Sequence, residues 1–593
     1  MRHARSALRS TLTLVLLTPC ALLAQQEAGP VRDGAVYAAT RAADSAPPAS
    51  ELRALVERFS LDEGSLTHRY RIEGSRARHE VLADFYRGWQ TRLAAQPFDR
   101  LSQEGKVDYL LLRQALRHRL DLLVLEEIRE RELAPLLPFL PAIRTLVEQR
   151  ERVDSVVPEE AARTLTGIAT QADSLRRALL STDSAPARPL PILGARAAQS
   201  LETSRTTLAQ WRIHYAGYDP RLSWWIDAPS RRADSALADY GRVLREKIVG
   251  VVPGADAPII GDPLGREALV RDIAFEMIDY TPEELLAIGE RELAWCEREM
   301  KKAAREMGLG DDWKAALERV KHDYAAPGDQ PGLVKRLADE AADYVERENM
   351  VTVPPLARDD WRLIMLSAEE QKVNPFFLGG DDIQVAFPTD AMADDDKRMT
   401  LRGNNMHFAR ATVHHELIPG HHLQGFLNQR YQPHRQLFST PFWTEGWAVY
   451  MEMMLYDRGF PRSPEDRIGM LFWRMHRAAR IIFSIKFHLW QMTPPEAIDF
   501  LVEHVGHERA NATAEVRRSF NGSYPPLYQA GYMLGALQLR ALRAEVVGKG
   551  KMTEWQFHDT VLKENQMPIE LVRALLLKRT LTRDYVAGWR FAE

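Results

Sequence analysis

Hydrophobic residues along most of the chain recur every three or four positions, as on one face of an α-helix, between polar residues suited to capping. Residues 280–308 are the clearest case. Thr281 is a suitable N-cap, Pro282 fits the first helical position and Glu284 completes a capping box. Gly308 is placed to end this helix.

A second segment, residues 492–506, repeats this arrangement with Thr493, Glu496 and Gly506. Similar segments follow one another from Glu51 onward. The pattern therefore predicts a mostly α protein built from many helices.

Strand patterns are few, and the best is residues 381–390. Here Ile383, Val385 and Phe387 alternate with other residues between turn-forming ends. We expect a small sheet at this position, near the histidine-rich helix that follows, which makes the fold class mostly α (α+β). The pattern leaves open whether this strand holds a substrate or is an ordinary loop edge.

Loops rich in Pro, Gly and Ser divide the helical chain. They are predicted near residues 181–194, 251–265 and 324–332. We expect a helical N-terminal part at about 51–260 and a second part at about 261–593.

The first residues have a different character. Residues 1–24 comprise a basic start without acidic side chains, an apolar run and a polar end, which is the layout of a secretory signal peptide. Cleavage after Ala24 would deliver the protein to the periplasm or the medium, with residues 25–50 as a flexible lead-in. Lipid anchoring at Cys20 is the less favoured alternative, because Pro19 stands where a small residue is usual.

Composition excludes several classes of protein. The chain has 593 residues and a formal net charge of −4, without a basic run that would follow phosphates, so we expect no nucleic-acid partner. After signal removal, Cys296 is the only cysteine, so no disulfide can form within the chain. No stable membrane insertion is expected for the mature protein, and its oligomeric state is not determined by these features.

Histidines are concentrated in one part of the chain. Six of the 17 fall between residues 407 and 434, and neutral imidazole is a common zinc ligand. They are His407, His414, His415, His421, His422 and His434.

The spacing of these histidines differs from the zinc-protease motif H-E-x-x-H. On a regular helix, His421 would lie about 240° round from His415, and His422 would lie roughly 10 Å further along the axis. Pro419 cannot donate a backbone hydrogen bond, and Gly420 permits unusual backbone angles. We therefore predict a bulge or break between residues 416 and 421 that returns His421 towards His415, with His422 as the less favoured alternative.

A third ligand is expected from residues 442–459, which form a second helical pattern. Glu445 and Glu452 are seven residues apart and share one face of this helix. Their neighbours are mostly aromatic or aliphatic, so a carboxylate here needs a partner, and a zinc ion is one such partner.

Three stretches carry a resemblance to known families. The glutamate helix of the gluzincin metallopeptidases resembles the stretch WTEGWAVYME. The bacterial family called domain of unknown function 885 resembles this chain more closely, in HHELIPGHHLQ, TEGWAVYMEM and YPPLYQAGYMLG. The resemblance covers most of the chain after about residue 50 and implies a zincin-like fold with one zinc ion per chain.

The insertion also resembles the dipeptidyl peptidase III family, whose His-Glu-x-x-Gly-His motif keeps both histidines as ligands. That resemblance implies His415 and His421 as zinc ligands, Glu445 as the third ligand and Glu416 as the general base. The extra proline of this chain keeps His422 open as the alternative to His421.

Two imidazoles and one carboxylate leave a position for water, as in catalytic zinc sites. Glu416 would take a proton from that water and later deliver it to the leaving amine. Glu452 and His414 are expected to orient the ligands. A further donor to the carbonyl oxygen is expected from Tyr524, Tyr528 or Tyr532, and Tyr532 is favoured because it opens the Y-x-x-G pattern.

These features predict a secreted or periplasmic zinc peptidase that acts on peptides. Two other hypotheses remain open at this point. One is a zinc hydrolase of a different amide or ester, and the other is a binding protein that keeps the fold without catalysis. The presence of Glu416 argues against the last.

Overall fold

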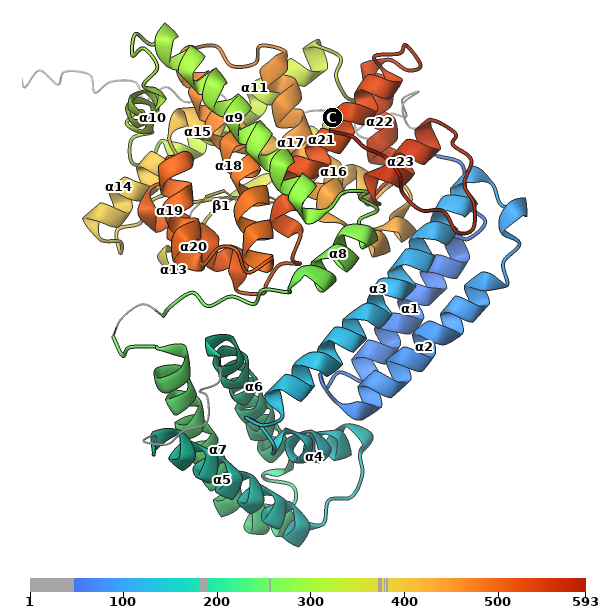
Figure 1. Ribbon diagram of the computed structural model, residues 1–593, viewed down its shortest axis with the longest axis vertical. Helices are drawn as coiled ribbons and strands as arrows, with labels where there is room; N and C mark the ends of the chain where they lie inside the picture. The colour runs from blue at the N-terminus through green and yellow to red at the C-terminus, as the bar shows by residue number, and fades with distance from the viewer. Residues whose placement is uncertain are drawn as a thin grey trace, which may run out of the picture. The chain divides into compact units, whose positions relative to one another are not determined.

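The computed structural model describes residues 47–181, 190–254, 257–371, 376, 377, 379 and 382–592 (Figure 1). Within these ranges nearly all regular structure is helical, accompanied by a single two-stranded sheet, so the predicted mostly α fold class is confirmed. The predicted signal peptide, Cys20 and most of the lead-in lie outside the described residues.

The N-terminal helices contribute to two hydrophobic cores. Helices α1–α3 share the larger core with side chains from residues 269–589, whereas α4–α7 and the end of α3 enclose a second core around Trp211 and Tyr240. The elements are α1 (Arg53–Arg69), α2 (Arg76–Ala94), η3 (Phe98–Arg100), α3 (Gln103–Leu133), α4 (Leu140–Arg152), α5 (Pro158–Leu180), α6 (Pro191–Tyr215), α7 (Pro220–Leu244) and η4 (Arg245–Val249).

The two capped helices form as predicted. In α9, the Thr281 N–H donates to the Glu284 carboxylate at 2.8 Å and the Glu284 N–H donates to the Thr281 hydroxyl at 3.2 Å. In α19, the Glu496 carboxylate accepts the Thr493 N–H at 2.8 Å. The middle helices are α8 (Arg266–Phe275), α9 (Pro282–Glu306), α10 (Trp313–Lys321), α11 (Gln330–Arg347), α12 (Pro355–Asp359), α13 (Ala368–Gln371) and α14 (Asp394–Gly403).

The sheet pairs β1 (Arg362–Met365) with β2 (Asp382–Val385) in parallel. The predicted strand is therefore confirmed, although it ends before Phe387. Ile383 and Val385 of β2 are buried in a small core that includes Val413 of the histidine-rich helix, so the sheet lies near that helix as expected.

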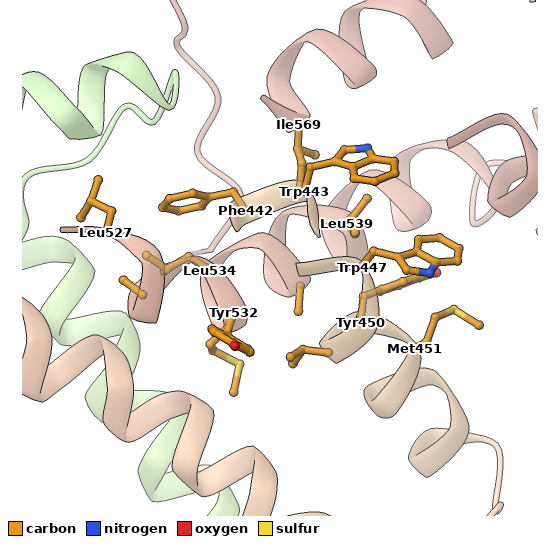
Figure 2. Packing of buried hydrophobic residues seen from close by; sticks show 14 of the residues in the cluster. Phe442, Trp443, Trp447, Tyr450, Met451, Leu527, Tyr532, Leu534, Leu539 and Ile569 are labelled. Atoms are coloured by element: carbon orange, nitrogen blue, oxygen red, sulfur yellow. The ribbon is translucent and has the colours of Figure 1, made fainter. Parts of the chain in front are cut away.

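The C-terminal helices surround the site. They are α15 (Met406–Glu416), α16 (His421–Asn428), η5 (Pro433–Phe438), α17 (Pro441–Asp457), α18 (Pro464–His488), α19 (Pro494–His504), α20 (Arg509–Phe520), α21 (Tyr528–Val546), α22 (Glu554–Lys563) and α23 (Ile569–Leu576). In Figure 2, Trp443 and Trp447 of α17 lie in the same hydrophobic cluster as Leu534 and Leu539 of α21. Within the described ranges, no helix combines the length and apolar character needed to cross a membrane.

Candidate metal centre

The histidine-rich helix is interrupted at the predicted place. Helix α15 ends at Glu416 and α16 begins at His421, so the predicted break is confirmed. The peptide bond before Pro419 is cis, and the Gly420 N–H donates to the carbonyl of His414 at 3.0 Å. The chain therefore makes a turn at the C-terminal end of α15, between Glu416 and His421, before it continues as α16.

Only glycine fits at position 420. A Cβ atom there would lie 1.8 Å from the carbonyl oxygen of His415 and 2.6 Å from that of His414. Both contacts involve backbone atoms, which cannot rotate aside as a side chain can. The close approach brings the rings of His415 and His421 to 4.7 Å between centroids.

Three side chains from three helices meet at this point. Glu445 Oε2 of α17 lies 3.0 Å from His421 Nε2 of α16 and 3.6 Å from His415 Nε2 of α15. The three candidate ligand atoms all lie within 4.8 Å of one another. Burial opposes the charge on Glu445, but the two imidazole rings hold its pKa well below the usual range.

His422 points elsewhere. Its Nε2 atom lies 2.7 Å from the carbonyl oxygen of Ala357 and 2.9 Å from Asp360 Oδ1, at the end of α12. Of the two histidines considered as the second ligand, the structure therefore turns only His421 towards Glu445.

The position of Glu445 depends on a close helix crossing. A Cβ atom on Gly446 of α17 would lie 2.7 Å from the Cα atom of Gly535 of α21, and one on Gly535 would lie 1.9 Å from the Phe442 carbonyl oxygen. The two backbones therefore touch, which small residues alone allow. This contact brings the tyrosines at the start of α21 beside Glu445.

Two of those tyrosines border the candidate ligands. The Tyr528 hydroxyl donates to Glu445 Oε1, the carboxylate oxygen that does not face the histidines. The Tyr532 ring lies nearly parallel to His415, with 6.2 Å between centroids. Burial raises the pKa of both hydroxyl groups, so both remain protonated donors. The link from Tyr528 to Glu445 is not part of the sequence prediction, which treated Tyr528 only as a possible oxyanion donor.

Glu452 orients His415, as the sequence suggests. Its Oε1 atom lies 2.6 Å from His415 Nδ1 and 3.4 Å from a guanidinium nitrogen of Arg477. Burial disfavours the charged carboxylate, but Arg477 and the His415 hydrogen bond hold the pKa of Glu452 at about 2. A charged Glu452 accepts a hydrogen bond from the Nδ1–H of His415 and so leaves Nε2 with its lone pair free to bind a metal.

The same expectation for His414 is wrong. Its ring is fully buried against Phe460, and neither ring nitrogen has a hydrogen-bond partner among the described residues. Burial lowers its pKa to about 4, so it is a neutral core residue. The physical reason is helical geometry. Consecutive residues on a helix point about 100° apart, so when His415 faces the candidate ligands, His414 points away from them.

Glu416 lies next to the three candidate ligands, and its carboxyl group is buried. Burial raises its pKa, and the neighbouring His415 and His421 rings partly offset this effect. Gly379 packs directly against the Glu416 carboxyl group, because a Cβ atom on Gly379 would lie 2.2 Å from Glu416 Oε2. This contact comes from a loop without a recognisable pattern, so the sequence offers no signal for it.

The donor set fits a zinc ion. Zinc–ligand bonds of about 2.0–2.1 Å place two ligand atoms about 3.3 Å apart in a tetrahedral site. The distances of 3.0 and 3.6 Å from Glu445 Oε2 to the two histidine nitrogens lie on either side of that value. Three protein ligands would leave a fourth position for water, as in catalytic zinc sites.

Comparisons with known proteins identify a family and a fold. The family model described as bacterial protein of unknown function (DUF885) matches residues 65–576. No curated protein matches the sequence. A presumed lipoprotein of unknown function from Shewanella oneidensis has a similar solved structure, with a TM-score of 0.65 and 16% identity, covering 89% of this chain and 100% of that one.

A second solved structure is also similar. It is that of a presumed lipoprotein from Colwellia psychrerythraea, with a TM-score of 0.56 and 14% identity, and the match covers 89% of this chain and 98% of that one. At these identities the two similarities show a shared fold.

Proposed function

The chain belongs to the bacterial family DUF885, whose description names no reaction, and we propose that it is a zinc-dependent peptidase of gluzincin type. The observation that carries this proposal is the meeting of His415, His421 and Glu445 within 4.8 Å of one another, beside a buried Glu416. The substrate would be a peptide, and the reaction would be hydrolysis of a peptide bond.

The roles of the side chains follow from their positions. A bound zinc ion would supply a water molecule with a pKa near 7 and would polarise the substrate carbonyl. Glu416 would take the proton of that water and transfer it to the leaving nitrogen. Burial raises the pKa of Glu416, which makes it a better proton acceptor than an exposed carboxylate.

Two further residues support this chemistry. Tyr532 lies beside His415 with a protonated hydroxyl, and it would donate a hydrogen bond to the carbonyl oxygen as negative charge develops there. Glu452 keeps His415 in the tautomer that offers Nε2.

Export from the cytoplasm is part of the proposal. Residues 1–24 have the layout of a signal peptide, and both similar solved structures are described as presumed lipoproteins. We propose a periplasmic or secreted protein cleaved near Ala24, with lipid attachment at Cys20 as the alternative.

Metal analysis tests the ligand assignment. The purified protein should contain about one zinc ion per chain. His415→Ala and Glu445→Ala should lose the metal, because each removes one of three protein ligands, whereas His422→Ala should retain it. Elemental analysis after gel filtration measures all four proteins. Full zinc occupancy in the His415 and Glu445 variants would exclude this site.

A second substitution separates chemistry from metal binding. Glu416→Gln should keep the zinc ion and the fold but lose turnover by roughly 10²–10⁴-fold, the usual contribution of a general base. A digest of a mixed peptide library, followed by mass spectrometry, provides the substrate for this comparison. If the variant cleaves that substrate at the wild-type rate, Glu416 is not the base.

A further inference from the structure

A cavity of about 660 Å³ lies at the N-terminal end of α17. Its walls come from α3 and α8, which lie side by side in Figure 1, and from the end of α18 and the loop between α20 and α21. The volume is within the range of small-molecule sites. Much of the wall is aromatic, with Phe275, Phe438, Phe487 and Phe520 among the lining residues.

Four acidic side chains line this cavity, and two of them, Asp272 and Glu276, come from α8 and its C-terminal end. Glu276 follows the end of α8 and is 6% exposed, and Asp272 lies one turn earlier on the same helix. One oxygen of Glu276 accepts a hydrogen bond from the Thr440 hydroxyl. Burial raises the pKa of Glu276 to about 8 and that of Asp272 to about 6. Two acids placed together in an apolar wall favour a cationic ligand.

Two arginines of the wall are already paired with other acids. Arg119 binds Glu63, and Arg129 lies 2.8 Å from Asp262. Arg271 lines the cavity from an exposed position on α8. The charged neighbour that acts on Glu276 is the acid Asp272, whereas Arg271 acts on Asp272 and opposes the rise in its pKa.

The cavity adjoins the candidate metal centre. Tyr524 lines the cavity and its ring contacts that of Tyr528, with 4.4 Å between centroids and 36° between the ring planes. Tyr528 in turn donates a hydrogen bond to Glu445. Thr440, which binds Glu276, is the N-cap of α17, and Glu445 follows five residues later. Five helical residues rise about 7.5 Å. An extended peptide of two or three residues, at about 3.3–3.6 Å each, covers a distance of this order.

We propose that this cavity binds the free amino end of the peptide substrate. The terminal ammonium would pair with Glu276, whose proton leaves to solvent on binding, and the aromatic wall would hold the first apolar side chains. This inference rests on the proposed peptidase function and specifies it further. The protein would then be an exopeptidase that releases fragments of two or three residues from unblocked N-termini.

Binding to an inactive enzyme tests this inference separately from catalysis. The zinc-loaded Glu416→Gln protein is titrated calorimetrically with Phe-Leu-Ala-Ala amide and with its Nα-acetylated form. The free amine should bind at least about tenfold more tightly, since acetylation removes the charge that pairs with a buried carboxylate. Equal affinities, or no binding of either peptide at millimolar concentration, would overturn the proposal.

Substitution of the acid completes the test. Adding Glu276→Gln should abolish most of the preference for the free amine, whereas adding Glu267→Gln, on the exposed side of α8, should leave it unchanged. Asp272→Asn, at a half-buried position, should reduce the preference, and it replaces the Glu276 variant in the test if that variant does not fold.

Retention of the full preference for the free amine in folded variants would overturn the assignment. Failure of the peptidase function itself would appear differently, as wild-type protein that cleaves neither peptide while this preference persists.

Discussion

All three candidate ligands contact a further polar side chain, and for His421 it is Gln424, whose Oε1 lies 3.4 Å from His421 Nδ1. Glu452 contacts His415 at the nitrogen away from the cluster, and Tyr528 contacts Glu445 at the oxygen away from the histidines. Such partners fix the direction of a ligand's lone pair before the ion arrives. Their removal typically costs about 10–100-fold in metal affinity.

Tyr528→Phe should therefore weaken zinc binding by about 10–100-fold, because Glu445 loses the hydrogen bond that fixes its carboxylate. Tyr532→Phe is the matched control. It removes the hydroxyl of a neighbouring tyrosine that is proposed to contact the substrate, so it should lower turnover and leave zinc affinity unchanged. Competition with a chromophoric chelator measures both affinities. Equal zinc affinity in the Tyr528 variant and the wild type would show that this hydrogen bond does not position the ligand.

Sequence reasoning identifies the three candidate ligands that meet in the structure but not all the side chains that contact them. His415 and His421 are six residues apart, with a Pro-Gly pair between them, so local chain geometry suffices to relate them. The contact from Tyr528 to Glu445 joins positions 83 residues apart. It depends on the crossing of α17 and α21, which periodicity within one helix does not predict.

At the scale of elements, the break between α15 and α16 is the decisive feature. On a straight helix, two histidines six residues apart could not share one metal ion. The break brings the rings of His415 and His421 to 4.7 Å between centroids. The capped helices and this break are predictable because their determinants are local. Strand β1 is not, since its residues Arg362–Met365 are largely exposed and do not alternate in burial.

Gly420→Ala should disrupt the metal centre. Its Cβ atom would lie 1.8 Å from the His415 carbonyl oxygen, so the chain must move and carry His421 away. Zinc content should fall well below one per chain. Gly425→Ala, in the middle of α16, is the control, because its Cβ atom meets nothing within 4 Å. That variant should keep its zinc and gain about 0.5–1 kcal/mol of stability from helix propensity. Zinc contents that are the same in both variants would contradict the role given to the break.

At the scale of the whole molecule, a buried charge cluster joins distant parts of the chain. Arg435 of η5 lies 2.8 Å from Asp108 and 2.6 Å from Glu104, both on α3, and 2.6 Å from Glu564 after α22. One guanidinium and the nearby His434 thus face three carboxyl groups. Burial, together with the neighbouring Glu104 carboxyl, raises the pKa of Glu564 to about 7, despite the opposing effect of Arg435.

Stability should therefore depend on pH through Glu564. The folded protein holds this proton up to about pH 7, whereas the unfolded chain releases it near the usual pKa of 4.5. The stabilisation is fully present below the unfolded value and is lost as the pH rises through the folded one. Glu564→Gln is neutral at every pH, so its free energy of unfolding should fall less than that of the wild type between about pH 5 and pH 8. Urea titrations across this range measure the difference, and Glu503→Gln, at an exposed position, should follow the wild type. If the free energies of unfolding of the wild type and Glu564→Gln change equally with pH, Glu564 does not hold an extra proton in the folded protein.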